Sequence, residues 1–231
     1  MANPTVVLVH GAFADASGFR GLYDQLLSED VTVVAPPNPL RGLSGGDGEY
    51  IKAVVNEIDG PVLLVGHSYG GSVITAAGTA NNVVGLVYIS GFAPDQGENL
   101  TDLQSKFPAP GIIPYIVQHE LPGGGNEFTL APEGFHESFC ADVPADDAAF
   151  YAITQRPLAG VALTEPAPTP AWRSRPAWAH FAATGNPATA AVPWPAFAGG
   201  SHLPVLSLVP PQPQVETDFS IRHQCAFWGV G

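Results

Sequence analysis

The sequence has little positive charge and no long hydrophobic run. Only 8 lysines and arginines stand against 21 acidic residues in the 231-residue chain, which gives a formal net charge of −13. Such a surface repels phosphate backbones and anionic lipid headgroups, so we expect neither nucleic-acid nor membrane partners. No apolar segment approaches the roughly 20 residues that a membrane-spanning helix needs.

Cysteine is also scarce, and the N-terminal segment lacks the basic residues and apolar core of a secretion signal. We therefore expect a cytoplasmic protein in which Cys140 and Cys225 stay reduced and do not pair. The length suits one α/β domain with a single core. The sequence is compatible with a monomer and with a homodimer.

Buried strands alternate with helices over the first ninety residues. Apolar segments rich in Val and Ile at 5–10, 31–35, 61–65 and 83–89 are typical of strands buried on both faces. Segments 18–27 and 50–58 between them carry apolar residues at helical spacing, and small residues fill 72–80. This alternation predicts an α/β fold with a mostly parallel, doubly wound sheet and helices on both faces.

The pattern changes twice in the rest of the chain. From about 92 to 170 strands lapse and short helical stretches, such as 133–140 and 145–154, lie between Pro and Gly breaks. We expect this insertion to form a helical cap over the carboxyl edge of the sheet. From about 181 to 231 the chain is rich in Pro and Gly, which marks an atypical C-terminal segment of a single domain spanning 1–231.

Residues 66–70, Gly-His-Ser-Tyr-Gly, match the nucleophile turn G-x-S-x-G. A buried strand precedes the motif and a small-residue helix follows it, so a sharp turn would expose Ser68 Oγ at a helix N-terminus. Glycines on both sides of the serine avoid collisions across that turn. We predict that Ser68 is the nucleophile and that the backbone N–H groups of Ala12 and Tyr69 form the oxyanion hole.

Several segments around these residues resemble a bacterial branch of small α/β-hydrolase serine esterases related to plant methylesterases and hydroxynitrile lyases. They are residues 9–17 (VHGAFADAS), 33–40 (VVAPPNPL), 65–71 (VGHSYGG), 91–95 (GFAPD), 135–143 (FHESFCADV) and 154–157 (TQRP), and the resemblance covers about residues 4–180. It implies a serine carboxylesterase of the α/β-hydrolase type that hydrolyses small esters without metal or cofactor. It also implies that the catalytic residues follow the chain order Ser, Asp, His.

The base and the acid are harder to place. His202, in a Ser-His pair, is the histidine with the chain order and context of the base, whereas His10 and His67 are interpreted as ordering and packing residues. Asn186 stands where the resemblance implies the acid, and no Asp or Glu occurs between residues 165 and 216. Asp95 is an alternative acid, although the role of a turn residue suits it better.

One cause would explain the missing acid and the unusual tail together. We hypothesise that a reading-frame shift or an equivalent replacement has substituted the C-terminus from near residue 180. Sequencing the encoding DNA tests this, because an intact alternative frame with an Asp motif and a Ser-His pair should then be found.

Apolar residues of the expected cap would select small aryl or short acyl esters; they are Phe107, Ile112, Ile113, Tyr115 and Phe139.

Two other functions stay open. A lyase that cleaves cyanohydrins would need a Lys in its pocket, for which Lys52 and Lys106 have no obvious claim. A non-catalytic relative would bind a small apolar ligand, and His119 and His136 would have surface or packing roles in either case.

Overall fold

The computed structural model describes residues 3–171 and the two short segments 205–207 and 214–216. The chain divides into two compact units, Ala2–Ala171 and a second unit that contains Trp172–Gly231 and Met1. In the second unit, β8 (Val205–Ser207) and β9 (Gln214–Glu216) form an antiparallel pair. A single domain over 1–231 stays a prediction, and the rest of this section concerns the first unit.

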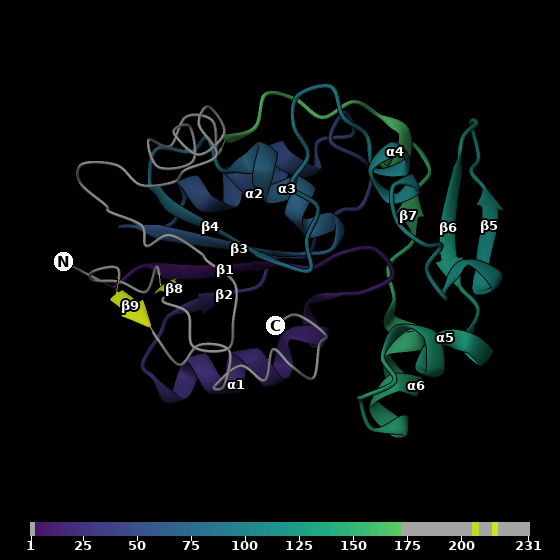
Figure 1. Ribbon diagram of the computed structural model, residues 1–231, viewed down its shortest axis with the longest axis horizontal. Helices are drawn as coiled ribbons and strands as arrows, with labels where there is room; N and C mark the ends of the chain where they lie inside the picture. The colour runs from purple at the N-terminus through teal and green to yellow at the C-terminus, as the bar shows by residue number, and fades with distance from the viewer. Residues whose placement is uncertain (1–2, 172–204, 208–213, 217–231) are drawn as a thin grey trace. The chain divides into compact units, whose positions relative to one another are not determined.

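The first unit is built on a parallel sheet of four strands (Figure 1). β1 (Thr5–Val9), β2 (Val33–Val34), β3 (Val62–His67) and β4 (Val83–Ile89) pair in the order β2-β1-β3-β4. The central strands β1 and β3 are almost completely buried because helices cover both faces. All four strands coincide with the apolar segments of the sequence, so the predicted α/β fold is confirmed.

Alternate residues of β1 face different helices. Val6 and Leu8 pack with Val65 against apolar residues of the α1 side, including Leu22 and Leu26. The 3-10 helix η1 (Ala16–Phe19) and α1 (Arg20–Ser28) cover this face, while α2 (Asp47–Asn56) and α3 (Tyr69–Ala77) lie over the other (Figure 1). The period of two along a strand thus produces a doubly wound arrangement.

The insertion, residues 92–170, is less helical than we predicted. It contains α4 (Leu100–Ser105), η2 (Ile113–Tyr115), α5 (Pro132–Phe139), α6 (Ala145–Thr154) and α7 (Val161–Thr164). It also contains an antiparallel sheet of β5 (Ile116–Glu120), β6 (Asn126–Leu130) and β7 (Leu158–Ala159), so the expectation of a helical insertion was wrong in this part.

The hairpin between β5 and β6 has a local cause. Gly123, Gly124 and Gly125 all have positive φ angles, which glycine adopts without steric cost. The N–H of Leu121 donates to the carbonyl of Gly125 at 3.0 Å and closes the turn. Three successive glycines between two short segments were therefore a hairpin signal that the sequence reading missed.

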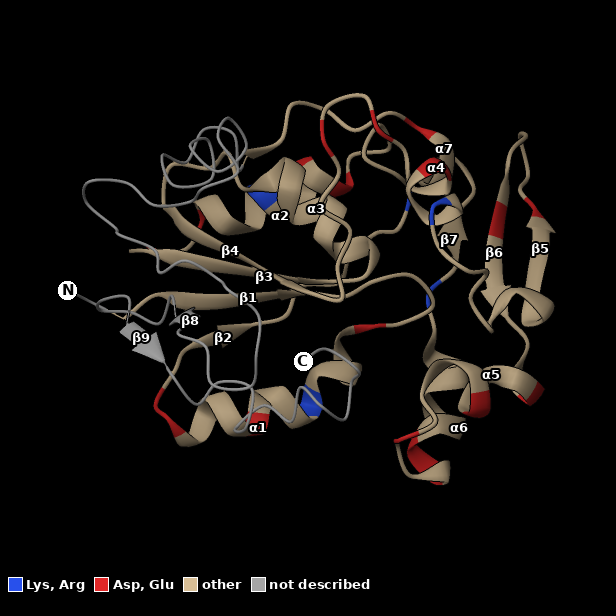
Figure 2. Ribbon diagram, viewed as in Figure 1, with Lys and Arg blue, Asp and Glu red and all other residues tan. Residues whose placement is uncertain are grey.

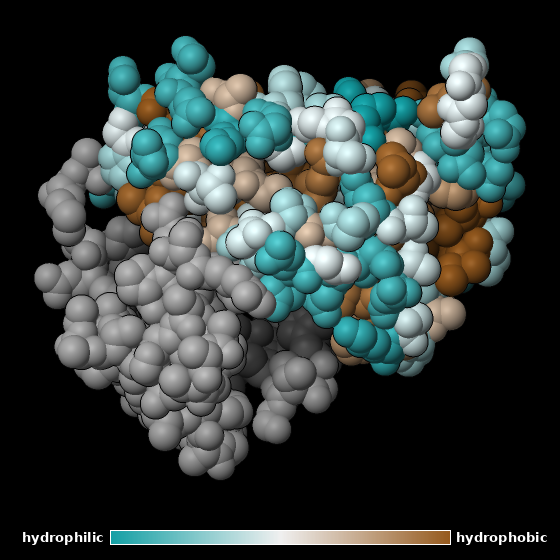
Figure 3. Space-filling model, turned by 90° about the horizontal axis from the view of Figure 1, so that it is seen from above, coloured by the Kyte–Doolittle hydropathy of each residue, from teal (hydrophilic) through white to brown (hydrophobic). Residues whose placement is uncertain are grey.

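The surface reflects the composition. Acidic side chains occur on α1, α5, α6 and the β5–β6 hairpin, whereas basic side chains are few (Figure 2). On the face shown in Figure 3, apolar residues reach the surface between hydrophilic ones. None of the helices in the described part of the chain combines the length and hydropathy that crossing a bilayer requires.

Candidate active site

Ser68 occupies a strained turn between β3 and α3. Its backbone angles are φ 52° and ψ −123°, a conformation that a residue other than glycine keeps only when its surroundings hold it there. The N–H groups of Gly71 and Phe92 donate to the Ser68 carbonyl at 2.9 and 3.0 Å. The side chain is half-buried, and its Oγ has no hydrogen-bond partner in the described part of the chain.

The glycines of the motif are required by close backbone approaches. A Cβ on Gly66 would lie 2.5 Å from the carbonyl oxygen of Gly70, and a Cβ on Gly70 would lie 2.1 Å from that of Val9. Real Cβ atoms essentially never approach other atoms closer than 3.0 Å. The predicted collision across the turn is therefore confirmed for Gly66, whereas Gly70 is required by the close approach of β1.

The loop after β1 lies against the nucleophile turn. A Cβ on Gly11 would lie 2.7 Å from Ser68 Cβ and 3.2 Å from Ser68 Oγ, so Gly11 allows the contact. Among the described residues, none accepts a hydrogen bond from the N–H of Ala12 or from that of Tyr69, the first residue of α3. Both donors stay available to an oxyanion, and that role remains a prediction.

His10 is held as a structural residue. Its Nδ1 donates to the Gly11 carbonyl at 3.0 Å, which leaves Nε2 to accept the N–H of Asn38 at 2.9 Å. Asn38 Nδ2 also donates to the His10 carbonyl. Burial lowers the pKa of His10, which favours this neutral form. Both ring nitrogens are engaged, so the predicted ordering role is confirmed and His10 has no free lone pair for Ser68.

No other histidine ring among residues 3–171 hydrogen-bonds with Ser68 either. His119 Nε2 hydrogen-bonds with Thr129 Oγ1 at 2.8 Å, and His136 Nε2 donates to the Val143 carbonyl at 2.8 Å, which matches their expected packing roles. His67 is half-buried, and burial lowers its pKa. The structure thus assigns no base among residues 3–171.

The structure describes only one of the other residues considered as acid or base, Asp95. His202 and Asn186 lie outside the described residues, and so does Cys225. The Asp95 carboxylate accepts the N–H of Gln96 at 2.7 Å, and the Asp95 carbonyl accepts the N–H of Glu98 at 3.0 Å. These contacts fit the turn role that the sequence favoured for Asp95, at the start of the insertion.

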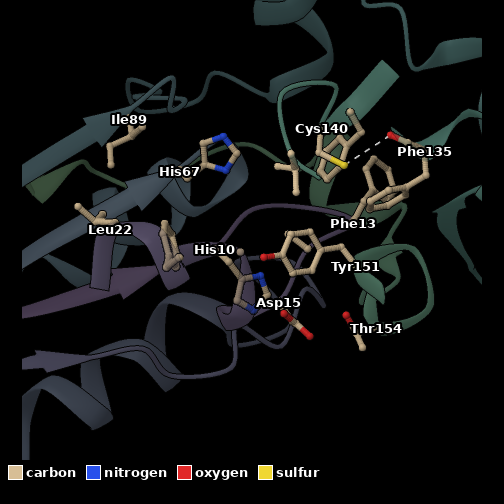
Figure 4. A pocket seen from close by; sticks show the side chains of 15 residues that line it. His10, Phe13, Asp15, Leu22, His67, Ile89, Phe135, Cys140, Tyr151 and Thr154 are labelled. Carbon is tan, nitrogen blue, oxygen red and sulfur yellow. Dashed lines mark hydrogen bonds between the residues drawn. The ribbon is translucent and has the colours of Figure 1, made fainter. Parts of the chain in front are cut away.

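A cavity of about 340 Å³ lies between the strand ends of the sheet and helices α5 and α6 (Figure 4). His67 and Phe13, the chain neighbours of Ser68 and Ala12, line it, whereas Ser68 itself does not. Most of the lining is apolar, with one carboxylate and one thiol. The other lining residues are His10, Ala14, Asp15, Gly18, Phe19, Leu22, Ile89, Phe135, Phe139, Cys140, Val143, Tyr151 and Thr154.

Most of the residues predicted to face a substrate do not line this cavity. Of the five, only Phe139 lines the cavity; Phe107 is 68% exposed and Ile113 is 51% exposed. The ring of Tyr115 packs against Gly134 on α5, where a Cβ would lie 2.1 Å from it. Hydrophobicity alone does not reveal which face of an insertion is buried, so the prediction included residues whose side chains are exposed at the surface.

The sequence did contain a signal for residues that line this cavity. Phe135 and Phe139 are four residues apart, and this spacing puts them on one face of α5. Their ring centroids lie 5.0 Å apart, and Phe13 meets Phe139 edge-on at 6.3 Å. These aromatic contacts therefore join the loop after β1 to the insertion. Neither Lys52 nor Lys106 lines the cavity, so the lyase alternative lacks its required cation there.

The polar lining is limited in what it can bind. The carboxylate of Asp15 accepts the N–H of Ser17 at 2.8 Å and caps η1. Cys140 is a free, half-buried thiol whose pKa is raised by burial, which makes it a poor nucleophile. Within residues 3–171, no group of three or more His, Cys, Asp or Glu is arranged to hold a metal ion.

Comparison with known proteins places these features in context. The model of the alpha/beta hydrolase family matches residues 6–215, which includes the turn at Ser68 and extends past residue 180. The chain is similar to a carbendazim hydrolyzing esterase of Nocardioides sp. (strain SG-4G), with 30% identity over 159 residues. That match covers 63% of this chain and 62% of the relative, so the chain spans less than two thirds of the relative's length.

Solved structures share the fold at low identity. Polyneuridine aldehyde esterase superposes with a TM-score of 0.59 at 22% identity, over 72% of this chain and 75% of that one. A methylesterase from Arabidopsis superposes with a TM-score of 0.55 at 17% identity, over 74% of each chain. The parallel sheet, the serine turn after β3 and the family match over most of the chain agree, and the chain belongs to the alpha/beta hydrolase family.

Proposed function

We propose that this protein is a serine carboxylesterase that hydrolyses small esters through an acyl-enzyme on Ser68. One observation carries the proposal: Ser68 is held in a strained turn, and the N–H groups of Ala12 and Tyr69 have no acceptor among the described residues. Strain of this kind persists where the surrounding structure maintains it, and it clusters at active sites. The Nocardioides relative, named for hydrolysing carbendazim, supports the same class of reaction.

The reaction would proceed in two steps. Ser68 Oγ attacks the ester carbonyl carbon while His202 takes its proton, and the N–H groups of Ala12 and Tyr69 stabilise the oxyanion. Collapse of the tetrahedral intermediate expels the alcohol, which receives the proton from His202. Water then attacks the acyl-enzyme by the same route and releases the acid.

The residue that pairs with His202 determines the expected rate of ester hydrolysis. An Asn at position 186 would orient the imidazole of His202 but would not stabilise its positive charge, and such a replacement costs about 10⁴ in rate in a serine protease. We therefore propose slow turnover, unless Asp95 or another carboxylate supplies the charge.

The insertion would act as the cap of this site. Helices α5 and α6 contribute Phe135, Phe139 and Tyr151 to the cavity, and the sheet side contributes Phe13 and Phe19. An aromatic cavity of about 340 Å³ is at the small end of ligand pockets. We propose esters with one aryl group or a short acyl chain as substrates.

Ser68→Ala tests the proposal in the full-length chain. We expect hydrolysis of p-nitrophenyl acetate, and labelling by a fluorophosphonate probe measured by intact mass, to be lost in this variant. The matched control is Ser28→Ala, since the Ser28 hydroxyl is exposed and its one hydrogen bond within the described part of the chain is to the Gln25 carbonyl. Activity of Ser68→Ala within about tenfold of the wild type would remove Ser68 from its role. Binding of an aryl ester without turnover or labelling would favour the non-catalytic alternative.

A further inference from the structure

Asp47 is a buried carboxylate next to the nucleophile turn. It is fully buried at the start of α2. Its Oδ1 accepts the N–H of Arg41 at 2.9 Å, and its Oδ2 accepts the N–H of Gly42 at 2.9 Å and the hydroxyl of Tyr69 at 2.8 Å. Burial raises the pKa of Asp47, and these three donors oppose the rise. A buried carboxyl with three donors is costly to replace, which points to a specific role.

Tyr69 connects Asp47 to the reacting centre. Its side chain is 2% exposed, and its hydroxyl bonds the carboxylate at the far end of the ring. Its backbone N–H, at the other end of the residue, directly follows Ser68 and is one of the two proposed oxyanion donors. Because Tyr69 is buried and its hydroxyl is held by a hydrogen bond, the peptide unit that carries its N–H is restricted in orientation. Asp47 therefore restrains the peptide between Ser68 and Tyr69.

The same carboxylate organises residues 40–47, which we call the 40–47 loop. This loop is bonded to the insertion at several points. The Arg41 guanidinium donates to Glu127 Oε2 on β6 at 2.8 Å and to the Pro157 carbonyl at 2.6 Å. The Leu40 carbonyl accepts the N–H of Ala159 on β7 at 2.9 Å. The loop thus links the β5–β6–β7 sheet to the carboxylate that anchors Tyr69.

Resting on the function proposed above, we propose that Asp47 is a positioning residue. Through the Tyr69 hydroxyl it holds the Tyr69 N–H in place for the oxyanion, and through the 40–47 loop it couples that donor to the seating of the insertion. Asp47 touches neither substrate nor Ser68, so its effect falls on the rate of the chemical step and much less on substrate binding.

Tyr69→Phe is the first test, because it removes the hydroxyl and keeps the backbone N–H. We expect kcat per active site, titrated with a fluorophosphonate, to fall roughly tenfold to a hundredfold, the loss typical of small misplacements, with KM within about threefold. The matched control is Tyr88→Phe, which removes the hydroxyl of a half-buried tyrosine, bonded to Thr75 Oγ1 at 2.9 Å. Both variants should lower the thermal midpoint similarly, and only the first should lower kcat.

Asp47→Asn and the double variant test the pathway. Asn presents an NH₂ donor to groups that already donate, so the Tyr69 contact is lost or reversed. If Asp47 acts through Tyr69, the double variant should have about the kcat of Asp47→Asn alone. Losses that multiply in the double variant would overturn the proposal. Arg41→Gln, whose side chain is partly exposed, tests the link to the insertion if the buried variants fail to fold. An unchanged kcat in Arg41→Gln would then overturn the coupling.

The outcomes separate this inference from the proposed function. If neither turnover nor probe labelling depends on Ser68, the proposed esterase fails, and the role of Asp47 fails with it. If both depend on Ser68 and Tyr69→Phe retains the wild-type kcat per titrated site, only the role of Asp47 is refuted.

Discussion

The same substitution, glycine to alanine, should have opposite effects at two positions. At Gly70 on α3, the new Cβ would lie 2.1 Å from the Val9 carbonyl oxygen and 2.9 Å from that of His10. Both neighbours are backbone, so α3 and β1 must separate by about 1.3 Å to reach an ordinary 3.4 Å contact. At Gly21 on α1, an added Cβ meets nothing within 4 Å. We expect Gly70→Ala to lower the free energy of unfolding by about 3 kcal/mol, the upper end of overpacking costs.

Gly21→Ala should instead raise the free energy of unfolding by up to about 1 kcal/mol, through helix propensity. Urea unfolding followed by far-UV circular dichroism measures both, because the helices of the first unit contribute to that signal. Tryptophan fluorescence does not suit this measurement, since all four tryptophans follow residue 171. Equal midpoints for wild type and Gly70→Ala would refute the assigned packing of α3 on β1. Destabilisation by Gly21→Ala would refute the open environment assigned to α1.

Two further predictions concern the cavity and the pH dependence of stability. Phe139→Ala should raise KM for phenyl acetate several-fold, because the substrate buries less apolar surface against the cavity wall. Ile113→Ala, outside the cavity, should leave KM unchanged. Equal effects of the two variants in steady-state kinetics would contradict the assigned lining. Burial lowers the pKa of His10 from its ordinary value of 6.5. As the pH falls below 6.5, the unfolded chain therefore binds more protons than the folded chain, and the free energy of unfolding decreases in that range. Urea midpoints at pH 5 and 7.5 should therefore differ less in His10→Gln than in the wild type; an equal difference would show that His10 does not contribute.

The sheet and the nucleophile turn could be read from local patterns. Strands buried on both faces leave continuous Val and Ile segments, and β4 coincides with residues 83–89 as predicted. The glycine at 66 was predictable because a sharp turn leaves no room for a side chain, whereas a side chain at 70 would collide with β1. The ordering role of His10 was predicted from its position before Ser68 in the chain, and its contacts with Gly11 and Asn38 confirm it.

The insertion was predictable only in part. Its helices α5 and α6 were recognised between Pro and Gly breaks, whereas the β5–β6 hairpin was missed because its strands mix polar with apolar residues and β5 is exposed along its whole length. The side that lines the cavity was not predicted: Tyr115 packs against Gly134 of α5, and Phe135 lines the cavity. Which face of a short amphipathic element is covered depends on its partner, and sequence spacing does not identify the partner.

The sequence by itself determined the parallel sheet, the position of Ser68 and the glycines around it, because each is marked by a pattern within a short segment: continuous apolar runs for the strands and G-x-S-x-G for the turn. Only the tertiary structure decided that the cavity is aromatic, that His10 has no free lone pair, and that Asp47 bonds Tyr69. Each of these joins residues between twenty and more than a hundred positions apart, such as Asn38 with His10 or Phe139 with Phe13. Such contacts depend on how helices and strands pack, and local periodicity contains no information about that packing.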